Sequence, residues 1–100
     1  MDKYRLRLLS HALQQLDEIY AYIANELDAQ EAAENLVEKL EEAIFSLEVM
    51  PHRYPKRRTG AYTNRAYRQV FVKNFCVVYR VDEAEKEVII VAVRYSRSNF

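Results

Sequence analysis

The stretch from Tyr67 to Tyr95 constrains the fold most, because two short breaks divide it into three apolar segments. Its apolar positions are mostly Val, Ile, Phe and Tyr, whose branched or aromatic side chains pack well on a pleated surface, and no Gly or Pro interrupts it. The first break is Lys73-Asn74, where Asn tolerates the positive φ of a tight hairpin turn, and the second is the mainly polar segment 82–87. The stretch predicts a three-stranded antiparallel meander.

The length of the first turn determines which strand residues face each other. With two residues in the turn, Val72 pairs with Phe75 and Arg68 pairs with Tyr79, and directly paired residues share a face. We expect one face to meet the rest of the protein and the other to be more polar. The first face carries Val70, Val72, Phe75, Val77, Tyr79 and Val81, and the second carries Tyr67, Gln69, Phe71, Cys76, Val78 and Arg80.

The second turn leaves two registers open for the last strand. If this turn spans residues 83–86, Ile90 and Ala92 join the core face and Tyr95 joins the other face. A one-residue β-bulge would reverse that assignment.

The first half of the chain predicts one strand and one helix. Tyr4, Leu6 and Leu8 alternate with basic residues, which is the period of a half-buried strand over residues 3–9. Ser10 then offers an N-cap hydroxyl, and apolar residues recur every three or four positions, as in an amphipathic helix. The expected apolar stripe consists of Leu13, Leu16, Tyr20, Ile23 and Leu27.

A second helix is expected from Asp28, where Glu31 three residues later would complete a capping box. Met50-Pro51 should end it, because the residue before proline is disfavoured in α geometry. The expected apolar stripe of this helix consists of Ala33, Val37, Leu40, Ile44 and Leu47.

The order of these elements predicts a single α+β domain over residues 1–100. The N-terminal strand would join a three- to four-stranded, mainly antiparallel sheet. Helices over residues 11–26 and 29–49, joined by a short link, would form an antiparallel hairpin on one face of that sheet. The residues expected in the core are Leu16, Tyr20, Ile23, Val37, Leu40, Ile44, Val77 and Tyr79.

The composition excludes several classes of site. Cys76 is the single cysteine, so the chain can form neither an intramolecular disulfide nor a cysteine-based metal site, and His11 and His52 are isolated from other metal-binding residues. We therefore expect no cofactor, no metal and a reducing cytoplasmic environment. No signal peptide and no apolar run of membrane-spanning length is present, so no membrane association is expected.

The charges are divided between the halves of the chain. Residues 1–50 hold 4 Lys/Arg and 11 Asp/Glu, whereas residues 51–100 hold 11 Lys/Arg and 4 Asp/Glu. A basic half can meet phosphate or an acidic partner. Acidic helices packed on a basic sheet could also compensate each other internally, and the asymmetry alone leaves both interpretations open.

Arginine recurs beside tyrosine in the basic half. Arginine offers a fixed fork of donors for phosphate and tyrosine offers a stacking face, a combination that can hold unpaired nucleotides. Arginines at strand ends can instead neutralise acidic helices or cover a core with their aliphatic stems. The recurring positions are Arg53-Tyr54, Arg65, Tyr67-Arg68, Tyr79-Arg80, Arg94-Tyr95 and Arg97.

The order strand, helix hairpin, basic loop and meander resembles the RelE/ParE superfamily of bacterial toxins. The resemblance covers almost the entire chain and is carried by Asp17-Glu18-Ile19-Tyr20-Ala21-Tyr22-Ile23-Ala24, Leu47-Glu48-Val49-Met50-Pro51, Tyr67-Arg68, Val77-Val78-Tyr79-Arg80-Val81-Asp82 and Val91-Ala92-Val93-Arg94-Tyr95. It implies a growth-arresting toxin of a type II toxin–antitoxin module, of the kind that includes plasmid-stabilisation systems. A cognate antitoxin would neutralise it, and operator DNA would be bound only indirectly through that antitoxin.

Two mechanisms occur among proteins that this chain resembles. RelE-like members cut messenger RNA on the ribosome with basic residues and a tyrosine, and ParE-like members block DNA gyrase without a nuclease centre. If the chain is a nuclease, the resemblance assigns catalysis to Arg68, Arg94, Tyr95 and Arg97. Cys76 departs from the nuclease pattern, because it stands where those enzymes carry an arginine that stabilises transition-state charge.

The sequence therefore favours inhibition by binding, with gyrase as the target, over ribosome-dependent RNA cleavage. A non-toxic binding domain on the same fold is a third possibility, because fold does not fix function. An acidic segment of the antitoxin could cover Arg57, Arg58, Arg94 and Arg97, while apolar residues fill a groove beside the helices. All residues expected to bind target or antitoxin are Arg57, Arg58, Arg65, Arg68, Arg80, Arg94, Tyr95 and Arg97.

Overall fold

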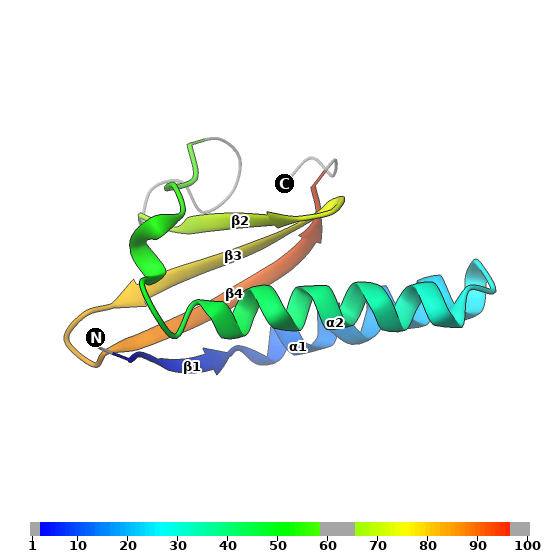
Figure 1. The fold of residues 1–100 in the computed structure, drawn as a ribbon, viewed down its shortest axis with the longest axis horizontal. Coiled ribbons are helices and arrows are strands. Elements are labelled where there is room, and N and C mark those ends of the chain that lie inside the picture. The colour runs from blue at the N-terminus through cyan, green and yellow to red at the C-terminus, as the bar shows by residue number, and fades with distance from the viewer. Residues whose placement is uncertain (1–2, 59–65, 97–100) are drawn as a thin grey trace.

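The computed structural model describes residues 3–58 and 66–96, which form an α+β domain of two helices packed on a four-stranded sheet (Figure 1). The expected fold class is confirmed. In chain order the elements are β1 (Arg5–Leu8), α1 (Ser10–Ala21), a π-helical segment (Tyr22–Glu26), α2 (Gln30–Ser46), a 3-10 turn (Pro51–Arg53), β2 (Arg68–Val72), β3 (Phe75–Asp82) and β4 (Glu87–Tyr95).

The sheet has the order β1-β4-β3-β2, with β1 parallel to β4 and the other pairs antiparallel. The meander and the register of its first hairpin are confirmed, because Val72 pairs with Phe75 and Arg68 pairs with Tyr79. The positive φ of that hairpin turn belongs to Lys73, at 53°, and not to the expected Asn74.

A β-bulge shifts the register of the last strand. Tyr79 pairs with Ile90, but Val78 pairs with Ala92, so β4 contains one extra residue at Val91. Ile90 lies on the helix-facing side as expected, whereas Ala92 packs on the opposite side. The same shift pairs Tyr95 with Phe75, so Tyr95 faces the helices, as expected for the bulged register and not for the regular one.

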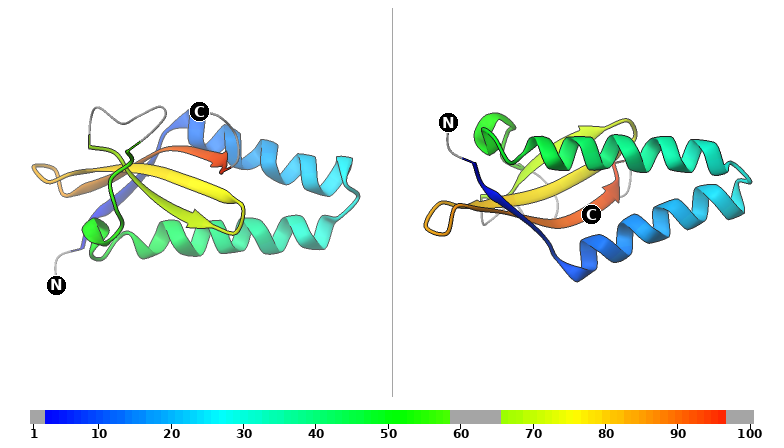
Figure 2. Two further views of the ribbon diagram at one scale, coloured as in Figure 1. Left: turned by 90° about the horizontal axis from the view of Figure 1, so that it is seen from above. Right: turned by 60° about the horizontal axis from the view of Figure 1, so that its bottom comes forward.

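The helices form an antiparallel hairpin that covers one face of the sheet and extends beyond the end where β2 turns into β3 (Figures 1 and 2). Neither expected cap is formed. Ser10 is the first helical residue and Leu9 occupies the N-cap position without a side-chain hydrogen bond. Ala29 is the N-cap of α2, also without such a bond, and Asp28 takes a positive φ of 49° in the link, so the expected capping box is absent.

The helix hairpin buries a slightly different face from the expected one. Along α1 and the π-helical segment that follows it, the core contacts are made by Ala12, Leu16, Ile19 and Ile23, while Leu13 and Leu27 are half-exposed. The small side chain of Ala12, which is fully buried, allows close approach to the sheet. On α2, Leu36 joins the expected Leu40 and Ile44.

The expected core is confirmed at its centre and not at its margin. Leu40, Ile44, Val77 and Tyr79 are buried, and Leu16 and Ile23 pack against them while half-buried. Tyr20 and Val37 are half-buried outside this cluster. Helix α2 ends at Ser46, earlier than the predicted end at Val49, and Met50 takes a left-handed φ of 55° before the 3-10 turn.

The face of the sheet away from the helices carries a second, smaller cluster. Cys76, Val78, Ile89, Val91 and Ala92 are buried there, with Leu9 and Tyr67 packed against them. We call this surface the far face. Among the described residues, no helix is both long and apolar enough to cross a membrane.

Candidate functional site

Arg68, the first of the expected site residues on the sheet, is engaged in holding the 3-10 turn. Its Nη1 donates hydrogen bonds to the His52 carbonyl at 3.1 Å and to the Tyr54 carbonyl at 2.6 Å. Tyr79, paired with Arg68 across the hairpin, donates its hydroxyl to the Pro51 carbonyl at 2.6 Å. Burial raises the pKa of Tyr79 to about 12, so this hydroxyl keeps its proton at neutral pH. The two side chains together fix the turn to the sheet.

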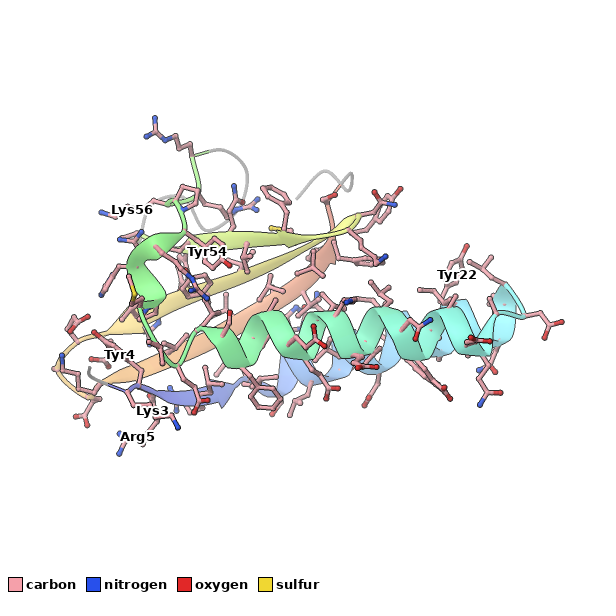
Figure 3. All side chains as sticks on the ribbon, viewed as in Figure 1. Lys3, Tyr4, Arg5, Tyr22, Tyr54 and Lys56 are labelled. Carbon is pink, nitrogen blue, oxygen red and sulfur yellow. The ribbon has the colours of Figure 1, made fainter. Side chains whose placement is uncertain are left out.

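Glu83 ties the same turn to the β3–β4 turn. Its Oε1 hydrogen-bonds with His52 Nε2 and accepts from the Tyr4 hydroxyl at 2.7 Å, and its Oε2 accepts from Lys86 Nζ at 3.0 Å. These hydrogen bonds lower the pKa of Glu83 to about 2, and the bond with His52 has the largest effect. The bond to Glu83 raises the pKa of Tyr4. Figure 3 places Tyr4 and Tyr54 at this end of the molecule, far from Tyr22 on the hairpin.

Arg57 reaches the centre of the far face from the segment before β2. It is only 9% exposed, its backbone N–H donates to the Tyr67 carbonyl at 2.7 Å, and its Nη1 donates to Gln69 Oε1 at 3.0 Å. The same nitrogen lies 4.0 Å from Cys76 Sγ. A cation from the loop therefore stands beside Cys76, where the sequence had indicated a missing arginine.

Cys76 is a buried thiol and not an activated nucleophile. Burial raises its pKa, and the opposing effect of Arg57 is smaller. A reactive cysteine needs a lowered pKa and access to solvent, and Cys76 has neither.

The remaining expected site residues divide between the two faces. Arg80 is paired with Ile89 and Arg94 with Cys76, so both lie on the far face. Arg58 is exposed at the end of the described segment. Arg65 and Arg97 lie outside the described residues.

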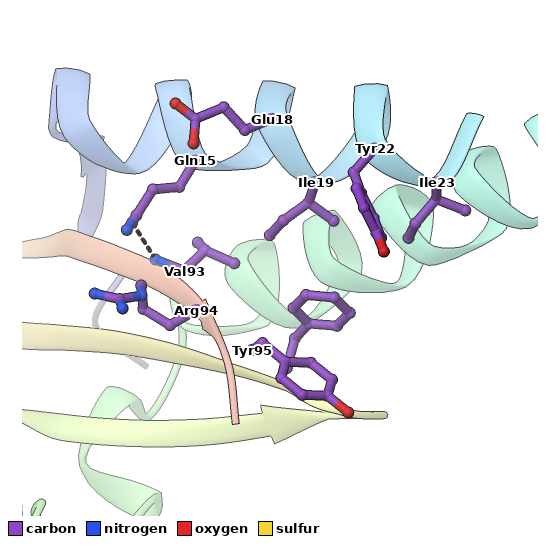
Figure 4. A pocket seen from close by; sticks show the side chains of 9 residues that line it. Gln15, Glu18, Ile19, Tyr22, Ile23, Val93, Arg94 and Tyr95 are labelled. Atoms are coloured by element: carbon purple, nitrogen blue, oxygen red, sulfur yellow. Dashed lines mark hydrogen bonds between the residues drawn. The ribbon is translucent and has the colours of Figure 1, made fainter. Parts of the chain in front are cut away.

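Tyr95 instead lines a groove between α1 and the sheet (Figure 4). Its ring packs edge-on against Phe75 at 5.6 Å between centroids. Gln15 Oε1 accepts a hydrogen bond from the Val93 N–H at 2.8 Å at the other end of the groove. The groove has a volume of about 610 Å³ and is lined by Gln15, Glu18, Ile19, Tyr22, Ile23, Phe75, Val93, Arg94 and Tyr95.

Tyr22 is the groove residue that sequence reasoning missed. It lies at the start of the π-helical segment, and its ring points from the helix toward the side of the groove that holds Tyr95 (Figure 4). It falls outside the expected apolar stripe, so helical periodicity gave no signal for it. The signal that could have identified Tyr22 is its position as an aromatic residue on the otherwise polar face of an amphipathic helix.

The three expected catalytic residues that the structure describes, Arg68, Arg94 and Tyr95, do not converge on one point. Arg68 and Tyr95 share the helix-facing side, but their partners on β3, Tyr79 and Phe75, are four residues apart, which is about 13 Å along a strand. Arg94 points to the opposite face from its neighbour Tyr95. Within residues 3–58 and 66–96 no cluster of three or more His, Cys, Asp or Glu side chains could hold a metal ion.

Comparison with known proteins gives a consistent family and fold. A family model described as the ParE toxin of type II toxin–antitoxin systems, parDE, matches residues 6–100. A solved structure of the chromosomal ParDE toxin–antitoxin system from P. aeruginosa is 21% identical and covers 93% of this chain and 96% of that one, with a TM-score of 0.76. Curated protein sequences yield no match.

Two solved RelE structures share the same fold. A chain of the RelBE2 toxin–antitoxin complex from Mycobacterium tuberculosis is 18% identical, with a TM-score of 0.66 over 93% of this chain and 98% of that one. A chain of the archaeal RelE–RelB complex from Pyrococcus horikoshii is 13% identical, with a TM-score of 0.67 over 96% and 99%. At these identities the likeness concerns the fold.

Proposed function

The chain belongs to the ParE toxin family of type II toxin–antitoxin systems, and from that premise we propose that it arrests growth by binding and inhibiting DNA gyrase. Inhibition by binding is favoured over RNA cleavage because the described candidate catalytic groups, Arg68, Arg94 and Tyr95, do not meet at one point. Cleavage of RNA requires a base for the 2′-hydroxyl proton and cations for the phosphorane within hydrogen-bond reach of one phosphate.

The described candidates do not meet that requirement. Arg68 uses its guanidinium on backbone carbonyls, Tyr95 lies about four strand residues away from it, and Arg94 faces the other side of the sheet. Arginine is a poor proton acceptor, and an ordinary tyrosine has a pKa of about 10. Inhibition by binding needs no such convergence.

We further propose that a cognate antitoxin neutralises the protein by filling the groove beside α1. The ParDE and RelBE structures with this fold are toxin–antitoxin systems, which supports a partner of that kind. The aromatic rings of Tyr22, Phe75 and Tyr95 line this groove and suit apolar side chains of an inserted segment. Arg57 is too buried to serve as an antitoxin contact.

Two assays run side by side test the proposed target. Purified protein is added to a gyrase supercoiling reaction, and reporter mRNA is examined by primer extension after brief induction. We expect inhibited supercoiling with intact mRNA, and relief when the product of the adjacent reading frame is supplied. Codon-specific cleavage that disappears in Tyr95→Phe, with supercoiling unaffected, would make the protein a ribosome-dependent endoribonuclease instead.

A further inference from the structure

The outer side of helix α2 carries a line of exposed glutamates that ends in an exposed phenylalanine. Glu31, Glu34, Glu38 and Glu41 follow one another at spacings of three, four and three residues, which places them on one side of the helix. Phe45 continues this spacing, and its ring is 61% exposed. At 1.5 Å per residue the line is about 21 Å long. We call these five residues the outer stripe.

The outer stripe lies away from the two sides of α2 that face the rest of the protein. Leu36 and Leu40 face the core, and Ala32 and Asn35 line a second cavity, of about 350 Å³, beside the β2–β3 turn. Successive residues are about 100° apart around a helix, which turns the stripe away from both the core and this cavity. Figure 1 shows α2 at the surface of the molecule, with no element of the described chain in front of it.

The charges of the outer stripe repel one another within the helix. Like charges three or four residues apart destabilise a helix, and consecutive glutamates of the stripe have this spacing. Lys39, the single cation of α2, pairs with Glu42 at 4.0 Å, and no basic residue occupies the last turn, where the helix dipole favours a cation. Alternating signs would keep this side equally soluble without the repulsion, so the single sign points to a positive partner.

The charge of the outer stripe selects the class of that partner. It would repel a nucleic acid or an anionic membrane surface, and a second copy docking through the same face would bring two acidic stripes together. A basic protein surface is attracted, and Phe45 adds an apolar anchor that a pocket on the partner can enclose. Proteins that hold DNA present basic surfaces, because they neutralise phosphates with Lys and Arg.

We propose that the outer stripe is the surface through which the protein docks on gyrase, against a basic region with an apolar pocket for Phe45. This inference rests on the proposed function, because it takes gyrase as the target. The lining of the groove beside α1 contains none of the stripe residues. Contacts with gyrase and contacts with the antitoxin can therefore be changed separately by substitution.

Binding of the intact protein to purified gyrase, measured by biolayer interferometry without DNA, tests this proposal beside the supercoiling assay. We expect Glu38→Gln/Glu41→Gln to weaken binding about three- to tenfold and to flatten the dependence of Kd on salt, because salt then screens fewer charge contacts. Phe45→Ala should weaken binding about tenfold or more at every salt concentration. The concentration for half-inhibition of supercoiling should rise by similar factors.

Two variants outside the stripe provide matched controls. Glu26→Gln/Glu85→Gln removes the same two charges from exposed positions, and Phe71→Ala removes a ring that is 59% exposed on β2. Both should bind and inhibit gyrase like the wild type. The stripe double variant should be at least as stable as the wild type in thermal unfolding, since it removes like-charge neighbours, and its antitoxin binding in a calorimetric titration should be unchanged.

The possible failures are distinguishable. Wild-type inhibition of supercoiling with unchanged affinity in the stripe variants would overturn this inference and leave the proposed function standing. Equal losses in the control variants would do the same, because they would show a general effect of charge or of apolar surface. Lost antitoxin binding in the stripe variants, with gyrase inhibition intact, would assign the outer stripe to the antitoxin. A wild-type protein that neither binds gyrase nor inhibits supercoiling would overturn both proposals.

Discussion

Replacing Arg68 by alanine tests whether this arginine holds the fold or acts on a target. Its guanidinium donates to two backbone carbonyls of the segment that contains the 3-10 turn, at 3.1 Å and 2.6 Å. A hydrogen bond from a charged group contributes about 1.5–3 kcal/mol, but Arg68 is half-buried and water can replace part of both bonds. We expect Arg68→Ala to lower the free energy of unfolding by about 2 kcal/mol.

Tyr79 supplies a second perturbation of the same turn. Tyr79→Phe removes the donor to the Pro51 carbonyl and leaves that buried oxygen unsatisfied, at a cost of about 1–3 kcal/mol. Once either side chain is lost, the turn can move toward solvent, so the other bond contributes less. The double variant should therefore lose less stability than the single losses added together, with a coupling of about 0.5 kcal/mol or more.

Urea unfolding followed by circular dichroism at 222 nm measures these changes. For a domain of this size, a slope near 1 kcal/mol per molar urea converts a 2 kcal/mol loss into a midpoint shift of about 2 M. Toxin activity is assayed well below the midpoint of each variant. If Arg68→Ala leaves the unfolding free energy within about 0.5 kcal/mol of the wild type while activity is abolished, the structural role is refuted and Arg68 belongs to the functional site.

Three further predictions concern other parts of the molecule. The pKa of Glu83 is lowered to about 2 in the folded state, so the ionised carboxylate stabilises the fold at pH values above about 4.5. This stability should be lost as pH falls from about 4.5 to about 2. Glu83→Gln should remove that part of the pH dependence of the unfolding midpoint. Because its folded pKa is raised to about 12, Tyr79 should contribute a loss of stability as pH rises from about 10 to 12, which Tyr79→Phe should not show. Tyr22→Ala should weaken antitoxin binding in a titration calorimetry experiment by about tenfold or more, whereas Leu27→Ala, exposed on the hairpin but outside the groove, should not.

The first hairpin of the sheet could be predicted residue by residue because its turn length fixes the register. Only two residues separate Val72 from Phe75, and alternation on both sides of the turn agrees with one pairing. The position of the helix hairpin on the sheet also followed from sequence, since an apolar stripe must meet the apolar face of the sheet.

The buried face of the first helix could not be predicted, because two different apolar stripes fit the helical period of three to four residues. Ile19 and Tyr20 are adjacent, and either can continue the run that passes through Leu16 and Ile23. Close packing on the sheet selected the stripe with the small residue Ala12, and periodicity does not register the size of a side chain. The two expected caps failed because Ser10 and Asp28 lie one residue from the observed N-cap positions, Leu9 and Ala29.

The least predictable feature, the bulge in β4, also decides the layout of the candidate site. Residues 88–93 are all apolar, so no alternation signals which of them faces the helices, and the bulge costs no burial. Without it Tyr95 would lie on the far face with the arginines, and Arg94 would line the groove with its side chain. With it, the ring of Tyr95 joins Phe75 and Tyr22 in an aromatic groove while Arg94 joins Arg57 beside Cys76. One inserted residue thus separates Tyr95 from Arg57, Arg80 and Arg94. This separation, together with the distance between Tyr95 and Arg68, supports our proposal of a protein that binds its target over one that cuts RNA.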